Sequence, residues 1–305
     1  MKFIVTGGAG FIGHNVVRQL KQQGHECFIV DSVTGYGFVP DDELHYLYAE
    51  RKKRMSKATV HHIDITNKKK LEAFFTTFGA MCDGVIHLAS FPRQKVVSGN
   101  PSWGSEVMST GLINLLEMTK KYCIPKFVYI SSSMVYGDFT DDVKEDAVCN
   151  PIGQYGIMKL AGEWLVKDYT RRGCFDHVII RPSAVYGEYD VEDRVVSKFM
   201  LNAMRDRTLK VNGALETLDF TYVEDAAAGI VGATLSKNAV NRTYNITKSH
   251  SWSLLDAANL AVSIAGSGKV NVRDKDADFP SRGALNIDAA RRDFGYNPQV
   301  DVEEG

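Results

Sequence analysis

Short runs of apolar, often β-branched residues alternate through the first half of the chain with longer stretches in which apolar residues recur every three or four positions. The longer stretches predict helices at residues 11–23, 68–77, 105–122 and 155–172. The short runs predict strands at residues 2–6, 26–30, 59–63, 84–88, 126–131 and 177–181. These strands are continuously apolar, which is typical of a parallel sheet covered on both faces. The right-handed rule for crossover connections then favours a doubly wound α/β sheet.

The pattern changes after residue 181. The sequence then predicts a helix at 193–205, an extended piece at 209–211, a turn and helix at 219–235, a strand at 243–247, a helix at 252–265 and an extended piece at 269–273. We predict a main domain of residues 1–182 with returns at about 219–247. Residues 183–218 and 248–305 are expected to form a smaller mixed α/β C-terminal lobe. The last residues, Glu303-Glu304-Gly305, resemble the first turn of a helix, which indicates a chain that continues further.

Composition excludes several classes of function. The 305 residues are 44% hydrophobic, enough for a large core, and 36 Lys and Arg against 37 Asp and Glu leave a net charge of −1. This balance favours neither nucleic acid nor an anionic membrane as a partner, and the basic runs at 51–54 and 68–70 are predicted to be solvated helix faces. Five cysteines without Cys-x-x-Cys spacing indicate neither a metal site nor a disulfide framework. The chain begins on a strand and has no apolar run that could span a bilayer, so we predict a cytoplasmic protein.

A glycine-rich turn, Thr6-Gly7-Gly8-Ala9-Gly10-Phe11-Ile12-Gly13, follows the first predicted strand and opens the first predicted helix. Gly7 permits the tight turn, Gly10 lets the backbone approach a pyrophosphate, and Gly13 lets the helix pack closely on the strand. The free N–H groups at the helix start, those of Phe11 and Ile12 included, favour phosphate, as does the positive end of the helix dipole. A lone glycine motif is weak evidence, but its strand-turn-helix context predicts a dinucleotide site.

Acidic residues close the next two predicted strands. Asp31 stands eighteen residues after Gly13, where a carboxylate accepts hydrogen bonds from the adenosine ribose and repels the extra phosphate of NADP. The sequence therefore predicts NAD as the cofactor; the alternative is that Asp31 is only a turn residue. Asp64 is placed to meet the adenine amino group and Ile65 to pack on the ring, although an Asp at a strand end is also an ordinary helix cap.

Tyr155 and Lys159 lie four residues apart, on one face of a predicted helix. An ammonium beside a phenol, next to the positive nicotinamide, favours the phenolate, so we expect a lowered pKa for Tyr155 and proton exchange near neutral pH. Ser131, Ser132 and Ser133 end the fifth strand, at the carboxyl edge where open α/β sheets place their sites. Each feature alone has an ordinary alternative, a surface pair or a cap. Their coincidence indicates hydride-transfer chemistry.

Together these motifs resemble the extended short-chain dehydrogenases, in the branch of NAD-dependent epimerases and dehydratases that act on nucleotide sugars. The resemblance covers nearly the whole chain and is specific for the superfamily, but much less specific for the substrate. It rests on Thr6 to Gly13, Asp31, His87-Leu88-Ala89, Ser131 to Gly137, Tyr155 to Lys159, Arg181 to Gly187 and residues 219–225. It implies a Rossmann-type fold and a catalytic set of Ser132, Tyr155 and Lys159. Further cofactor contacts are implied for Leu88, Ala89, Ser90 and Pro182, and for Tyr155 and Lys159 themselves.

Two positions after the implied catalytic serine separate the branches of this family. Dehydratases usually carry Asp-Glu there, decarboxylases keep a Glu at the second position, and a reductase branch carries a Cys after the serine. This chain has Ser133 and Met134 instead, so the resemblance implies an epimerase. In the implied mechanism, Tyr155 takes the proton of the sugar hydroxyl at O4, hydride passes to NAD, and hydride then returns to the other face of the ketosugar.

The resemblance implies a substrate site but leaves its specificity open. Ser132, Ser133 and Tyr155 are expected at the sugar, and Ala184 stands where related 4-epimerases carry Asn or Thr. Leu218 and Met108 also depart from the family pattern, whereas the segment 32–57 is lengthened as in uronate 4-epimerases. Arg93 is the candidate contact to the sugar. Lys210 and Val211 are the candidates for the base, and Arg282 is the candidate for the diphosphate.

We therefore predict an epimerase that inverts C4 of a UDP-hexose or UDP-uronate and keeps its NAD bound. A dehydrogenase or reductase with net redox turnover, or a dehydratase, is the alternative among enzymes. A regulatory protein that kept the fold and lost catalysis is the alternative outside them, and the intact Ser132, Tyr155 and Lys159 oppose it. By resemblance alone, we expect a homodimer formed through the helices at 105–122 and 155–172.

Overall fold

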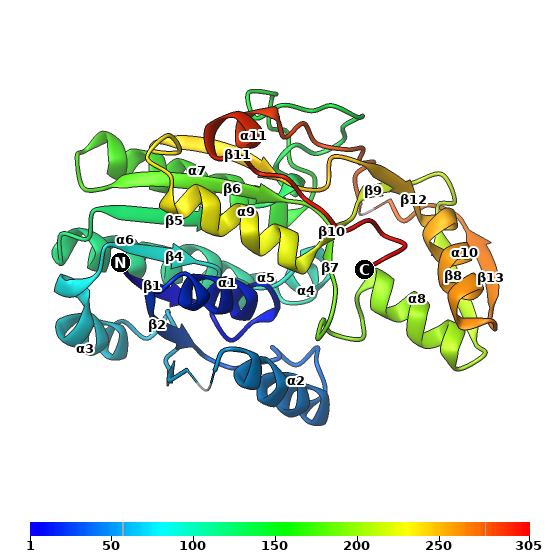
Figure 1. The fold of residues 1–305 in the computed structure, drawn as a ribbon, viewed down its shortest axis with the longest axis horizontal. Coiled ribbons are helices and arrows are strands. Elements are labelled where there is room, and N and C mark those ends of the chain that lie inside the picture. Colours follow the sequence, from blue (N-terminus) through cyan, green and yellow to red (C-terminus); the bar gives the residue numbers. More distant parts are fainter. Residues whose placement is uncertain (57, 278) are drawn as a thin grey trace.

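A seven-stranded parallel sheet forms the centre of the computed structural model, which describes residues 1–56, 58–277 and 279–305 (Figure 1). Its strands run in the order β11-β6-β5-β4-β1-β2-β3. They are β1 (Lys2–Thr6), β2 (Glu26–Asp31), β3 (Val60–His62), β4 (Gly84–His87), β5 (Lys126–Ile130), β6 (Asp176–Pro182) and β11 (Arg242–Ile246). All neighbouring pairs are parallel. This confirms the predicted doubly wound, Rossmann-type sheet.

Helices bury both faces of the sheet, because successive side chains of each strand point to opposite sides. One face packs against α1 (Phe11–Gln22), α9 (Val223–Leu235) and α11 (Asp288–Phe294), with Phe3 and Val5 among its strand residues. The other packs against α3 (Lys68–Phe78), α6 (Leu112–Lys121) and α7 (Gln154–Arg171), with Ile4 and Phe127 among its strand residues. Each alternate set of strand side chains therefore belongs to a separate core.

A smaller unit lies beyond the carboxyl edge of the sheet, at the right of Figure 1. Its helices are α8 (Val195–Met204) and α10 (Leu254–Ala265), and its strands are β8 (Thr208–Asn212), β9 (Thr217–Asp219), β12 (Ser251–Ser253) and β13 (Lys269–Arg273). β8 pairs with β13 in parallel and β9 with β12 antiparallel. Phe199, Leu209, Phe220 and Ala258 centre its own hydrophobic core. A short parallel pair, β7 (Val185–Tyr186) with β10 (Thr221–Tyr222), lies where the chain crosses between the units.

Several elements differ from the sequence expectation. The stretch 105–122 is a helix interrupted by a π-helical segment, η2 (Glu106–Gly111), between α5 (Pro101–Ser105) and α6, and α4 (Gln94–Gly99) precedes it. Two short 3-10 helices, η1 (Gly79–Met81) and η3 (Ser133–Val135), were also not foreseen. The sequence assigned 248–305 to the smaller lobe, but α11 packs on the main sheet through Ile287 and Ala290. Residues 302–304 form a turn rather than a helix.

The helix α2 (Asp41–Arg54) fills most of the segment 32–57, whose last residue lies outside the described residues. Asp41, Asp42 and Glu43 occupy its first turn and the basic run 51–54 its last, so its charges complement the helix dipole at both ends. The expectation that the basic run is a solvated face is wrong for Arg51, which is buried.

Candidate active site

The glycine turn after β1 is packed too closely for side chains. Gly7 has φ +71°, and a Cβ there would lie 2.5 Å from the backbone nitrogen of Ala89. A Cβ on Gly13 would lie 2.1 Å from the Gly7 carbonyl oxygen. Gly10 caps α1 without a side-chain hydrogen bond, and the first turn carries no acidic residue. The start of α1 at Phe11 and Ile12 therefore offers backbone N–H groups and a positive dipole end, the arrangement that suits a pyrophosphate.

Asp31, the last residue of β2, holds the same turn. Its Oδ2 accepts a hydrogen bond from the Ala9 amide at 3.0 Å, and its Oδ1 accepts one from the Val33 amide at 2.8 Å. Burial raises the pKa of Asp31, opposed by those two hydrogen bonds and by the charge of Arg51. The carboxylate thus lies beside the glycine turn with lone pairs left for a ribose hydroxyl.

The remaining residues expected at the cofactor lie along the same edge. Leu88 and Ala89 donate their amides to the Thr6 carbonyl at 2.9 and 3.0 Å, so the loop after β4 lies against the turn after β1. Asp64 accepts hydrogen bonds from the amide and hydroxyl of Thr66, both at 2.8 Å, in a turn before α3, and the helix cap is Asn67 rather than Asp64. Three more residues are expected at the cofactor. Ser90 follows Ala89 in the same loop, and Ile65 is buried. Pro182 is buried and is the last residue of β6.

The implied catalytic residues come together at the ends of β5 and α7. Lys159 is buried and its Nζ donates to the Ile130 carbonyl oxygen at 2.8 Å, two residues before Ser132. The same Nζ lies 5.8 Å from the ring centre of Tyr155 and 5.3 Å from that of Tyr129. Burial lowers the pKa of Lys159 to about 7, and the charge of Glu163 opposes this. The amine of Lys159, which exchanges its proton near neutral pH, therefore lies against the phenol ring of Tyr155.

The pKa of Tyr155 moves in the direction opposite to the expectation. Burial raises it, because an apolar surrounding disfavours the phenolate. The charge of Arg194 and a hydrogen bond with Ser132 act against this rise. A pKa expected from the neighbouring lysine alone leaves out the desolvation of the phenol.

The residues expected at the sugar and the nucleotide differ in burial and in the partners they already have. Ser133 donates its hydroxyl to that of Ser183 at 3.2 Å, and Ala184 has a positive φ of 34°. Arg93 donates to the carbonyl and the carboxylate of Asp193, at 2.6 and 2.5 Å, so an ion pair already engages it. The nucleotide candidates lie in and beside the smaller unit: Lys210 is exposed on β8, Val211 is buried in the core of that unit, and Arg282 lies near Thr217.

Arg282 and Arg194 form a pair of cations on the substrate side. The Nε of Arg282 is buried without a hydrogen-bond partner, and burial together with the charge of Arg194 lowers the pKa of Arg282 to about 10. Arg194, which the sequence analysis missed, lies 3.6 Å from Asp190 and keeps about a third of its side chain exposed. The charge of Arg194 acts on both Tyr155 and Arg282 and lowers the pKa of each.

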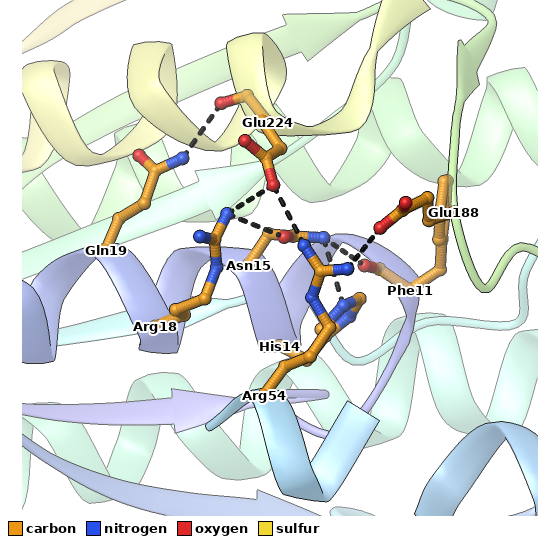
Figure 2. A network of polar contacts seen from close by, with 8 residues as sticks. All are labelled: Phe11, His14, Asn15, Arg18, Gln19, Arg54, Glu188 and Glu224. Carbon is orange, nitrogen blue, oxygen red and sulfur yellow. Dashed lines mark hydrogen bonds and ion pairs between the residues drawn. The ribbon is translucent and has the colours of Figure 1, made fainter. Parts of the chain in front are cut away.

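Arginines also fix residues 187–194, which we call the 187–194 connection, between β7 and α8. Figure 2 shows Arg54 of α2 reaching both Glu188 of this connection and Glu224 of α9. Arg18 of α1 donates to the same Glu224 oxygen at 2.6 Å. Arg51 donates through Nε and Nη2 to the carbonyl of Tyr189, at 3.1 and 2.6 Å. The connection is thus held directly by α2, and Arg54 of α2 is tied in turn to α9 and α1 through Glu224 and Arg18.

The inner end of this network reaches the glycine turn. His14 is fully buried in α1, and its Nδ1 lies 3.1 Å from the Gly10 carbonyl oxygen. Its Nε2 lies 3.2 Å from the amide nitrogen of Asn15, whose Oδ1 accepts from Arg18 at 3.3 Å. Burial lowers the pKa of His14 to about 4, and the charges of Arg51 and Arg54 add to this. The imidazole is therefore neutral at physiological pH.

Comparison with known proteins identifies the family. Residues 3–247 match the model of the NAD dependent epimerase/dehydratase family. The chain belongs to this family. A putative UDP-glucose 4-epimerase of Methanocaldococcus jannaschii is 29% identical over 99% of this chain and 95% of its own length. A UDP-glucuronate 4-epimerase of Thermodesulfobacterium geofontis is 30% identical over 76% of this chain and 71% of its own length.

A solved structure agrees closely with the fold. The UDP-glucuronic acid 4-epimerase of Bacillus cereus, in complex with UDP-glucuronic acid and NAD, superposes with a TM-score of 0.90 at 28% identity, covering 100% of this chain and 96% of its own. The predicted superfamily and the NAD cofactor are confirmed, and the free helix start at Phe11 with the carboxylate of Asp31 fits that cofactor.

Residues 1–56, 58–277 and 279–305 lack two kinds of feature, a metal-ligand cluster and a membrane-spanning helix. No cluster of three or more potential metal ligands is present in this part of the chain. None of the helices formed by these residues is both long and apolar enough to cross a membrane.

Proposed function

We propose that this family member is an NAD-dependent nucleotide-sugar epimerase that inverts C4 of a UDP-hexose or UDP-uronate through a transient 4-keto intermediate. The observation that carries the proposal is the set of Ser132, Tyr155 and Lys159 at the carboxyl edge of the sheet, with Ser133 and Met134 beside it in place of carboxylates. Without an acid to expel water or to assist loss of a carboxyl group, the site supports oxidation and reduction at a single carbon.

The proposed chemistry assigns a task to each side chain. Tyr155 as phenolate removes the proton of the C4 hydroxyl, Ser132 holds that oxygen by a hydrogen bond, and Lys159 stabilises the phenolate from beneath. NAD held by the glycine turn and Asp31 would supply reversible hydride transfer at C4, and its positive nicotinamide would add to the charges that favour the phenolate.

Phosphate and base recognition is proposed for the smaller unit. The buried Arg282, with its Nε unpartnered, is suited to a diphosphate, because a desolvated guanidinium is stabilised by a phosphate that pairs with it. Val211 anchors β8 in the core of the unit, and the neighbouring Lys210 is free to contact the nucleotide.

The charge of the pocket favours a uronate over a hexose. Arg194 faces the reacting phenol and is balanced only loosely, by the buried Asp190 at 3.6 Å. A diphosphate accounts for Arg282 but not for a second cation near Tyr155. A carboxylate on C5 of the sugar would supply a close negative charge to pair with Arg194. The UDP-glucuronic acid in the Bacillus cereus complex agrees with this proposal.

The test is incubation with a panel of UDP-, GDP-, CDP- and dTDP-sugars, followed by separation of the products. We expect a C4 epimer of a UDP-sugar, without net NADH formation. Tyr155→Phe should lower turnover about 10²- to 10⁴-fold while the protein still binds NAD. Tyr122→Phe, which removes an exposed hydroxyl bonded to Thr76 on the far side of α6, is the matched control and should leave turnover unchanged. Steady NADH production, or full turnover by Tyr155→Phe, would reject the proposal.

We also propose a homodimer formed through α6 and α7. Ile157 and Trp164 lie seven residues apart on α7, and their side chains are 52% and 65% exposed, beside Ile113 of α6 at 41%. Exposed apolar residues at two-turn spacing are suited to a second helix pair. Sedimentation should show a species of two 33.8 kDa chains, and Trp164→Glu should give monomers. Leu215→Glu, which changes a still more exposed apolar residue outside α6 and α7, should leave the dimer intact.

A further inference from the structure

A buried carboxylate lies one helical turn beyond the implied catalytic lysine. Glu163 follows Lys159 by four residues on α7 and is fully buried. Arg181 of β6 donates to it twice, Nε to Oε1 at 2.9 Å and Nη2 to Oε2 at 2.7 Å. Both side chains are almost inaccessible, so the pair is a desolvated, bidentate ion pair. The chemistry proposed above assigns no task to it.

Glu163 is also tied to the end of β5. The Ser131 hydroxyl donates to Glu163 Oε1 at 2.6 Å. Ser131 stands between Ile130, whose carbonyl accepts the Lys159 ammonium at 2.8 Å, and Ser132. Two successive turns of α7 therefore hold two successive residues, Ile130 and Ser131, at the end of one strand.

We propose that Glu163 is a positioning residue of the transfer site, which sets the placement of Ser132 relative to Lys159 and Tyr155 through its hydrogen bond from Ser131. This inference rests on the proposed function. Ser131 has no freedom to move while Glu163 is itself fixed by Arg181, so the β5 end is clamped to α7 from its buried side. Ser132 follows directly and inherits that placement.

The charge of Glu163 adds a second effect. Among the groups facing Lys159, the rings of Tyr129 and Tyr155 carry no charge, and His87 is neutral because burial lowers its pKa to about 3. Glu163 raises the pKa of Lys159 against the effect of burial, and it keeps part of that influence although Arg181 and the more distant Lys167 also face it. The carboxylate thus favours the protonated form of the buried amine against the effect of burial.

Two variants separate these effects from a structural role. Ser131→Ala keeps the Glu163–Arg181 ion pair and removes only the link to β5. Glu163→Gln keeps the size and removes the charge, but leaves Arg181 buried without its carboxylate, so folding is checked by circular dichroism and thermal unfolding. Thr234→Val is the matched control, because it removes a fully buried hydroxyl bonded only to the Ile230 carbonyl of its own helix. Ser131→Thr keeps a hydroxyl at the decisive position.

With the UDP-sugar that the wild type epimerises, Ser131→Ala should lower kcat about tenfold at an unchanged KM, the equivalent of one charge-assisted hydrogen bond. Ser131→Thr should restore it, and Thr234→Val should match the wild type. Folded Glu163→Gln should show the same loss, and the pH above which kcat falls through deprotonation of Lys159 should move lower. Unchanged kcat and pH profile in folded Ser131→Ala and Glu163→Gln would overturn the inference and leave Glu163 a structural residue.

A substrate-free measurement keeps this result apart from failure of the proposed function. The tyrosinate absorbance of Tyr155 is titrated as the difference between each protein and the same protein carrying Tyr155→Phe. Ser131→Ala should raise the pH of that step because Ser132 no longer supports the phenolate, and Glu163→Gln should raise it because Lys159 loses charge. A wild type inactive on every nucleotide sugar would reject the proposed function. Variant titrations that coincide with the wild type would still reject the inference.

Discussion

Burial decides the chemistry of single residues in this site more than sequence neighbours do. Tyr155 and Lys159 were recognisable from their four-residue spacing, yet burial raises the pKa of the phenol and lowers that of the ammonium to about 7. Both shifts favour the uncharged pair. The cation that opposes this for the phenol, Arg194, comes from elsewhere in the chain. A motif therefore identifies the reacting groups, whereas the fold sets their protonation.

At this scale we predict that Arg194 selects the sugar. Arg194→Met should lower kcat/KM for UDP-glucuronate about 10- to 100-fold, the loss of a hydrogen bond to a charged group, and should change kcat/KM for UDP-glucose far less. The measurement is steady-state epimerisation of both sugars. Arg205→Met, at the far end of α8 and exposed, is the control. Equal losses on both sugars would mean that Arg194 does not distinguish a carboxylate.

The elements show which parts of the fold a sequence pattern can predict. The parallel strands and the helices that cover them were predictable because each has a continuous apolar run or an apolar stripe. α2 was not, because most of its 14 residues are polar and only Leu47 and Arg51 are buried. Its stability comes from charges at its ends and from contacts with residues far along the chain, such as the Tyr189 carbonyl. No local pattern contains that information.

The same limit applies to the candidate site. The glycine turn, Asp31, Ser132, Tyr155 and Lys159 were predictable because each belongs to a short motif with a mechanical reason for its spacing. Glu163 and Arg194 were not, since their roles depend on partners contributed by other elements: Ser131 and Arg181 for the one, the phenol of Tyr155 for the other. Arg93 was predicted at the sugar, and the structure pairs it with Asp193.

For the elements, we predict that α2 holds the 187–194 connection in place. Arg51→Met removes two hydrogen bonds to the Tyr189 carbonyl, and amide hydrogen exchange in residues 187–194 should become about 10- to 100-fold faster. Lys52→Met, one residue further along α2 and exposed, is the matched control and should leave the exchange unchanged. If both variants exchange like the wild type, the connection is held by its other contacts.

Over the whole molecule, distant parts of the chain converge on the edge of the sheet where the site lies. The last residues return to it: the Gln299 and Val300 amides donate to Asp225 of α9 at 2.9 and 2.8 Å, and Tyr186 donates to the Asp301 carbonyl at 3.2 Å. The red C-terminal trace in Figure 1 passes between the two units at this point. Stability and site geometry therefore depend on the same long-range contacts.

Folding stability should consequently respond to a buried group next to the cofactor turn. The pKa of His14 is about 4 in the folded chain against 6.5 for a free histidine, so the unfolded chain binds one more proton between those values. The stability that the neutral His14 contributes is complete above about pH 6.5 and is lost as the pH falls toward 4. His87 acts in the same direction and Asp219, whose pKa burial raises to about 7, in the opposite one. Both cancel when wild type and His14→Gln are compared.

Denaturant unfolding of the two proteins at pH 7.5, 6 and 5 tests this. Relative to His14→Gln, the wild type should lose about 2 kcal/mol between pH 7.5 and pH 5, because each pH unit below 6.5 costs about 1.4 kcal/mol per extra proton bound by the unfolded chain. Acid would then place a charge on a fully buried ring in the first turn of α1, directly after the glycine turn. A difference in stability that stays constant across the three pH values would show that His14 does not titrate as a buried neutral group.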